Sequence, residues 1–322
     1  MQSTPIIEIL TKKDIISVEQ ASQIKDSDSN QPFSIHWELR LLLYLGITFL
    51  STGVGVLIYK NIDTIGHNIL IGLIALVCLT CFYFAFKHRK PFSWGEIEES
   101  TNLDDFALLG GCLAFLTLEG YLQYQYNFFG TRYGLAAFLP AILFFFCAYL
   151  FDNRGILSMA ITALASWIGV SITPLQLLKN NDFNSQNIVV TAISLGIFLI
   201  IVGWISIHKE FKKHFSFTYL FLGGNLAMIA ALSGLFAFEL KFIYFIIIAI
   251  LSFQSIVYAR SKQSYLFLLM GVIYGYIAFS YYLFEIIPSS FEVELYLFYF
   301  MLSGAGIVLF FVNINKILGI RK

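Results

Sequence analysis

Long runs of apolar residues alternate with short polar segments along almost the whole chain. Ten runs are close to the ~20 residues that an α-helix needs to cross the hydrocarbon core of a bilayer. They occupy residues 41–59, 69–86, 106–124, 133–151, 155–173, 188–207, 218–238, 242–259, 264–283 and 295–312. The runs lack the alternating pattern of barrel strands, and only helices or closed barrels satisfy backbone groups in lipid. The pattern therefore predicts an all-α, polytopic membrane bundle of ten transmembrane helices.

The composition also indicates a membrane protein. Of the 322 residues, 58% are hydrophobic and 12% are charged, whereas soluble domains carry about 25% charged residues. A soluble fold could not bury so much apolar surface, so the lipid bilayer is the expected partner. The formal net charge is +0, which gives no reason to expect a nucleic-acid partner.

Lysine and arginine collect in every second gap between the apolar runs. If the N-terminus is cytoplasmic, sixteen of the twenty such residues lie in cytoplasmic segments, and the four in outer loops are Lys60, Arg132, Lys179 and Lys241. Cytoplasmic loops are enriched in these residues, so we expect both termini to be cytoplasmic. This multi-pass topology, with no cleavable signal peptide visible, favours the bacterial cytoplasmic (inner) membrane.

The first forty residues form the only sizeable segment outside the apolar runs. Thr4 and Pro5 are typical of a helix start, and Ser17 with Gln20 forms a capping-box signature for a second helix. The sequence thus predicts a helical hairpin and linker at residues 1–35, followed by a ten-helix transmembrane domain at residues 36–322. The hairpin either docks a cytoplasmic protein partner or lies on headgroups or the bundle. The second alternative is favoured because so short an apolar face buries little area.

The same region carries a family resemblance. Its elements are the segment Ile9-Leu10-Thr11-Lys12-Lys13-Asp14-Ile15-Ile16-Ser17-Val18-Glu19-Gln20-Ala21, then Trp37-Glu38-Leu39-Arg40, then glycines 46, 53 and 55 before Tyr59-Lys60-Asn61. Over about 65 residues the chain resembles a family of bacterial predicted membrane proteins that is known as a domain of unknown function. Asp14 and Ile62 depart from the glycine and tryptophan usual in that family. The resemblance implies a membrane protein and transfers no catalytic residue.

Glu119 is the one ionisable residue deep inside an apolar run. It lies about 13 residues into run 106–124, about 20 Å from the predicted cytoplasmic edge. Ionisable groups in the membrane are costly, so each is a functional candidate. Glu119 is either a carboxylate that couples transport to protons or cations, or a group near enough to the outer surface to reach water or a tyrosine hydroxyl.

Asn225 and Gln254 are the next polar candidates. They lie at similar depths in neighbouring runs of opposite direction, where a hydrogen bond between their side chains is plausible. Such bonds hold helices together, and this packing role is the favoured interpretation. A substrate-binding role would require a polar cavity beside them.

Several other sites have weaker sequence support. Cys78 and Cys81 form a CxxC motif inside an apolar run, where packing is the favoured role, and all five histidines lie outside the runs or at their ends. We therefore expect no cofactor or metal site, and no enzyme activity. The charged stretch 87–105 is explained by headgroup contact followed by a solvated linker.

Two functions remain. The first is a permease-like carrier of a small solute or lipid, which the ten runs and Glu119 favour. The alternative is a non-transporting membrane scaffold or accessory subunit that docks a partner through residues 1–35, which the scarcity of polar groups in the runs favours.

Overall fold

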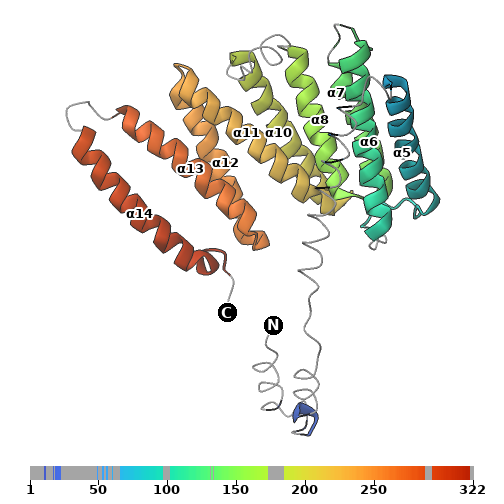
Figure 1. Ribbon diagram of the computed structural model, residues 1–322. Coiled ribbons are helices and arrows are strands. Elements are labelled where there is room, and N and C mark those ends of the chain that lie inside the picture. Colours follow the sequence, from blue (N-terminus) through green and yellow to red (C-terminus); the bar gives the residue numbers. More distant parts are fainter. Residues whose placement is uncertain are drawn as a thin grey trace. The chain divides into compact units, whose positions relative to one another are not determined.

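The computed structural model describes residues 66–96, 102–130, 132, 134–172, 185–286 and 292–319, with isolated positions among the first 65 residues. The described residues form nine α-helices and one short 3-10 helix, η1 (Figure 1). The elements are α5 (His67–Lys87), α6 (Asn102–Tyr126), α7 (Leu135–Phe151), α8 (Arg154–Ile172), α10 (Gln186–His208), η1 (Lys213–Phe215), α11 (Ser216–Ala237), α12 (Lys241–Lys262), α13 (Tyr265–Ile286) and α14 (Glu292–Ile317).

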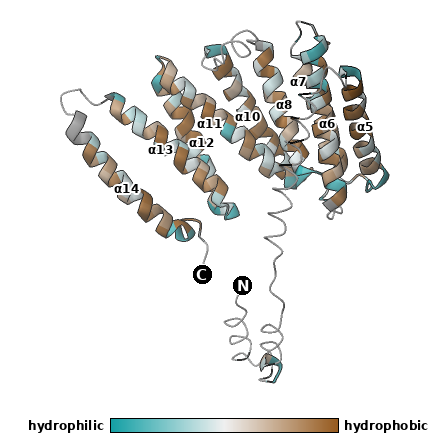
Figure 2. Ribbon diagram, in the orientation of Figure 1, coloured by the Kyte–Doolittle hydropathy of each residue, from teal (hydrophilic) through white to brown (hydrophobic). Residues whose placement is uncertain are grey.

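The described residues confirm the all-α prediction, and nine of the ten apolar runs are helical as predicted. Each run from 69–86 onward coincides with one helix, whereas run 41–59 lies outside the described residues, apart from isolated helical positions. Eight helices are long and apolar enough to cross a membrane, and α7, with 17 residues, is shorter. Hydrophobic residues cover the helices, and most hydrophilic residues lie at their ends (Figure 2). The chain is a membrane protein with several candidate spans.

Helices that follow one another in the sequence are neighbours in space. The closest pairs are α7 with α8, α10 with α11, and α12 with α13. Helix α5 packs on α6, where the Cys78 thiol donates to the Gly111 carbonyl at 3.5 Å. All four cysteines are free thiols, and Cys78 is buried, which agrees with the packing role favoured for it.

Helix α11 has the most buried surface of the candidate spans and contacts α8, α10, α12 and α13. Two glycines let it approach α10 closely. A Cβ atom added to Gly196 would lie 2.6 Å from the Gly223 carbonyl oxygen, and one added to Gly223 would lie 2.8 Å from that of Gly196. Only glycine fits at this crossing, as in other small-residue contacts between membrane helices.

Helix α14 is joined to α13 by a series of polar contacts. The Tyr276 hydroxyl donates to Ser303 at 3.2 Å, Ser280 is hydrogen-bonded to Tyr299, and the Tyr265 hydroxyl donates to Asn315 at 2.5 Å. The three hydrogen bonds are spread along the two helices and connect α14 to α13 at several levels.

Contacts within the chain divide it into residues 1–70 and 71–322. In the first unit, the Ser17 backbone N–H donates to the Gln20 side chain at 3.0 Å, and the Gln20 backbone N–H donates to the Ser17 hydroxyl at 3.2 Å. These reciprocal bonds confirm the predicted capping box. Apart from a few isolated helical positions, the rest of the predicted hairpin lies outside the described residues.

Candidate functional site

Glu119 lies within the protein interior and not on the lipid-facing surface. Its relative exposure is 5%. Residues Leu108, Cys112 and Phe115 of α6 pack into a core shared with α7 and α8, and Glu119, four residues after Phe115, lies on the same helix face. Neither carboxyl oxygen has a hydrogen-bond partner among the described residues. A carboxyl group buried in this way offers two unused acceptors to a proton or cation.

The side chain of Asn225 is hydrogen-bonded to other residues than Gln254, the partner predicted for it. Its amide nitrogen donates to the Phe221 carbonyl at 2.8 Å and contacts the Met270 sulfur at 3.2 Å, and the Tyr274 hydroxyl donates to its Oδ1 at 2.9 Å. Met270 and Tyr274 belong to α13, whereas Gln254 belongs to α12. The predicted bond to Gln254 is wrong because Asn225 faces α13 at this level of α11.

Gln254 is half-buried and lines a small pocket with Gly224, Met228 and Ser255. The pocket holds about 20 Å³, whereas ligand pockets usually hold hundreds of cubic ångströms. Within the described part of the chain, the pocket beside Gln254 is therefore too small for the substrate-binding role. This arrangement favours the packing interpretation of both residues.

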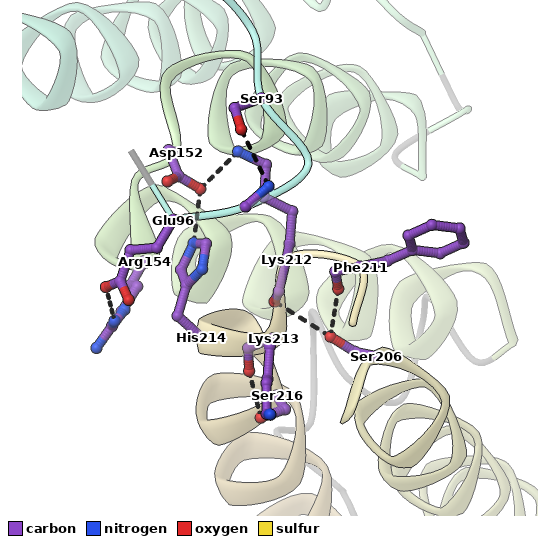
Figure 3. Close-up of polar contacts among 11 residues, drawn as sticks. Ser93, Glu96, Asp152, Arg154, Ser206, Phe211, Lys212, Lys213, His214 and Ser216 are labelled. Atoms are coloured by element: carbon purple, nitrogen blue, oxygen red, sulfur yellow. Dashed lines mark hydrogen bonds and ion pairs between the residues drawn. The ribbon is translucent and has the colours of Figure 1, made fainter. Parts of the chain in front are cut away.

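A buried ionic cluster lies where α7 ends and η1 begins. One oxygen of Asp152, Oδ1, is 2.7 Å from Nζ of Lys212 and 2.6 Å from Nε2 of His214 (Figure 3). The side chains are 5%, 1% and 5% exposed, respectively. Lys212 also lies over the Phe92 ring, 5.3 Å from its centroid. The opposite charges of Asp152 and Lys212 compensate each other, as burial requires.

Both members of the ion pair have left-handed backbone conformations. Asp152 ends α7 with φ 61°, and Lys212 precedes η1 with φ 45°. Left-handed conformations are uncommon for a bulky residue such as lysine. Contacts on either side hold Lys212 in place: its N–H donates to the Trp94 carbonyl at 2.9 Å, and the Ser206 hydroxyl donates to its carbonyl at 3.1 Å. The cluster thus ties segment 91–96 to the ends of α7 and α10.

A polar cavity of about 490 Å³ lies beside this cluster, within the range of small-molecule sites. It is formed where α5 and α7 end and where α6 and α8 begin, with His214 from η1. Its charged and imidazole side chains come from His88, Arg89, Lys90, Glu96, Asp104, Asp105, Asp152, Arg154 and His214. Three segments predicted to be cytoplasmic, 87–105, 152–154 and 208–217, therefore meet at one end of the bundle.

Contacts around the cavity correct the prediction for stretch 87–105. Beyond the basic residues next to the membrane, this stretch was expected to be a solvated linker. Glu96 pairs with Arg154, the Asn153 amide donates to Asp105 at 3.1 Å, and Nδ1 of His88 is 3.5 Å from Asp104. Asp105 and Glu96 thus bind the end of α7 and the start of α8, whereas Asp104 pairs with His88 within the stretch itself. The prediction failed because Asn153 and Arg154 lie 48 and 58 residues from their partners in the sequence.

The sequence alone does not identify Asp152, Lys212 and His214 as a cluster. In the sequence, Lys212 is one of the positive charges of a loop predicted to be cytoplasmic. The available signal was indirect: the loops that carry these residues were predicted on the same side of the membrane. That prediction puts the loops on one side of the membrane and does not specify which side chains contact each other.

The arrangement has the chemistry of a site for polar ligands. Among the described residues, no group of three or more His, Cys, Asp or Glu side chains is placed to hold a metal ion. The cavity instead presents guanidinium, ammonium and imidazole groups together with carboxylates. Such groups bind polar ligands through charge-assisted hydrogen bonds.

The comparison with known families agrees with the predicted resemblance. Residues 8–157 match a family described as predicted membrane protein (DUF2157). The match extends well beyond the first 65 residues, through α5, α6 and α7 to the start of α8. It includes Glu119, Asp152 and most of the cavity lining, whereas Asn225, Gln254, Lys212 and His214 follow it. No curated protein and no solved structure matches the chain.

Proposed function

We propose that this protein is a carrier of a small solute in the bacterial cytoplasmic membrane, coupled to protons or cations through Glu119. The observation that carries the proposal is the buried Glu119 carboxyl group, whose two oxygens have no partner among the described residues. Ionisable groups inside spanning helices commonly mark ion pathways and proton relays, because burying them has no benefit for stability. The protein acts without enzymatic chemistry and without a cofactor in this proposal.

The proposed topology has ten spans and cytoplasmic N- and C-termini. The distribution of lysine and arginine supports it, and so does the meeting of alternate connections at one end of the bundle. In this orientation the polar cavity opens toward the cytoplasm. Glu119 then lies about 10 Å from the outer end of α6, since seven residues separate it from Tyr126.

Proton-flux measurements test the carrier role. The purified full chain is placed in liposomes that contain a pH-sensitive dye, and amino acids, sugars and carboxylates are added in turn. We expect at least one solute class to change the internal pH with the wild type and not with Glu119→Gln. Glu239→Gln removes an exposed carboxylate from the connection between α11 and α12 and serves as the matched control.

Two results contradict the proposal in different ways. If Glu119→Gln retains full solute-driven proton flux, Glu119 has no coupling role. If no solute class produces flux with the wild type, the carrier role itself is wrong.

The second candidate is a non-transporting scaffold or accessory subunit. The filled interior around Asn225, with a pocket of only about 20 Å³ beside Gln254, favours it. A protein partner would then bind through residues 1–35. Copurification of a defined partner with the full chain, and its loss when residues 1–35 are deleted, would support this candidate.

A further inference from the structure

A second large cavity lies between α8, α10 and α11 and has a different chemistry from the polar cavity. Its volume is about 490 Å³. The side chains that line it come from residues 162–170 of α8, 188–195 of α10 and 226–233 of α11. Among these described residues, the lining includes no Asp, Glu, Lys or Arg side chain. The cavity therefore suits an apolar ligand.

The hydroxyl groups in the lining are engaged with the protein itself. Thr162, Ser166 and Thr191 donate to backbone carbonyls one turn earlier in their own helices, at 2.9, 2.9 and 2.7 Å. Ser233 also has an interaction of its own. A ligand in this cavity therefore needs no hydrogen-bonding groups.

The cavity is a groove that opens to the surface of the helices. Val189 and Leu195 in its lining are buried, whereas Thr162, Ser166 and Ile229 are exposed. The exposed residues form a rim, and in a membrane this rim faces lipid. The cavity is called the apolar groove below.

Small side chains from all three helices line the apolar groove: Ala165, Ala192 and Ala230. In membrane proteins, small residues usually let helices approach closely, as Gly196 and Gly223 do where α10 crosses α11. At the groove the small residues instead leave space between the helices. Atoms that line an empty space lose van der Waals contacts, so a ligand that fills the groove restores them.

The apolar groove lies within one half of the bilayer. Its walls are the second half of α8, the first half of α10 and the second half of α11. In the proposed topology this is the outer half. Along α8 the groove extends from Thr162 to Val170, about 12 Å of helix. One leaflet contributes about 15 Å of hydrocarbon, so the groove has nearly the length of a lipid chain in its leaflet.

We propose that the apolar groove binds one acyl chain of a membrane phospholipid. An acyl chain has no hydrogen-bonding groups, matches the groove in length, and surrounds spanning helices at this depth. In the groove it contacts three helices instead of one and gains van der Waals contacts. The lining contains no charged side chain, so the groove recognises the chain and not the headgroup. The inference is independent of the coupling role of Glu119.

Photocrosslinking tests this proposal. The full chain is purified in dodecyl maltoside and mixed with a phosphatidylcholine that carries a diazirine in the middle of one acyl chain, and mass spectrometry identifies the labelled peptides. Ala192→Phe fills the groove. Val190→Phe is the matched control, because it adds the same ring to α10 at an exposed position outside the groove. Helix α14, which has no buried residue between Tyr296 and Ile317, gives the level of non-specific labelling.

We expect stronger, saturable labelling of peptides from the groove than of α14 in the wild type. Unlabelled phosphatidylcholine and phosphatidylglycerol with the same chains should compete equally, because the lining contains no charged group. Ala192→Phe should reduce groove labelling to the level of α14, whereas Val190→Phe should retain the labelling of the wild type. If the melting temperature shows that Ala192→Phe is misfolded, Ala165→Phe fills the groove from α8 instead.

Three results overturn the proposal. The first is groove labelling no stronger than that of α14, or an equal loss of labelling in Val190→Phe. The second is competition by only one of the two phospholipids, which would show recognition of a headgroup. The third is a dimer in light scattering that Ala192→Phe converts to a monomer, because a second copy of the chain would then occupy the groove.

Discussion

Oδ1 of Asp152 and Nζ of Lys212 are 2.7 Å apart in a buried ion pair that joins the end of α7 to the start of η1. The residues are 60 positions apart, and both have left-handed backbone conformations. This pair, with His214, fixes the loop that precedes α11. Three of the connections at this end of the bundle are thereby held together.

Removing one partner of this pair should be strongly destabilising. Lys212→Met leaves the Asp152 carboxylate buried without the ammonium group that compensates its charge, and we expect a loss of about 3–5 kcal/mol. Unfolding can be followed in detergent with a thiol-reactive dye, because Cys78, Cys112 and Cys147 are buried. Lys213→Met, at an exposed position, should cost less than about 0.5 kcal/mol. Equal effects at the two positions would contradict the ion-pair account.

The crossing of α10 and α11 should be intolerant of a single methyl group. Gly196→Ala places a Cβ atom 2.6 Å from the Gly223 carbonyl oxygen, so the helices must separate at a cost of about 1–3 kcal/mol. The same thiol assay measures this cost. Gly304→Ala in α14 is the control, because nothing lies within 4 Å of the added atom. Wild-type stability of Gly196→Ala would show that the crossing is looser than described.

Asn225 and Tyr274 should be weakly coupled. Tyr274→Phe removes the hydroxyl that donates to Asn225, and a double-mutant cycle with Asn225→Ala should give about 0.6 kcal/mol, the average for hydrogen bonds between membrane helices. Asn225→Ala with Gln254→Ala forms the comparison cycle and should give almost no coupling. Stronger coupling to Gln254 than to Tyr274 would contradict the observed pairing.

Replacement of Glu119 by an apolar residue should increase stability and abolish the proposed transport. Glu119→Met removes two buried acceptors that have no partner among the described residues, and we expect a gain of about 1–3 kcal/mol. Glu285→Met is the control, since it removes a partly exposed partner of Lys241 and should give no gain. A large loss of stability in Glu119→Met would indicate that the carboxyl group has a structural role.

The sequence predicts the helices well because each depends on local composition. An apolar run of about 20 residues bounded by charged residues has one stable form in lipid, and runs 69–86 through 295–312 each coincide with a helix. The position of Glu119 inside an apolar run follows from the same reasoning, whereas its burial depends on which face of α6 packs against the core. The capping box of Ser17 and Gln20 was predicted because its partners are only three residues apart.

Side-chain partners could not be predicted in the same way. Asn225 contacts α13 and not α12, a choice set by how α11 is rotated about its axis. The cluster of Asp152, Lys212 and His214 joins loops that are about 60 residues apart. Neither arrangement has a local pattern in the sequence, because both depend on the three-dimensional packing of the helices.

The proposed topology is tested most directly by labelling introduced cysteines in intact cells with a membrane-impermeant maleimide. Arg132→Cys and Glu239→Cys lie in predicted outer loops, and Glu210→Cys and Lys262→Cys lie on the predicted cytoplasmic side; all four positions are exposed. We predict that the first two react from outside and that the other two react only after permeabilisation. The reverse pattern, or equal labelling of all four, would contradict the account.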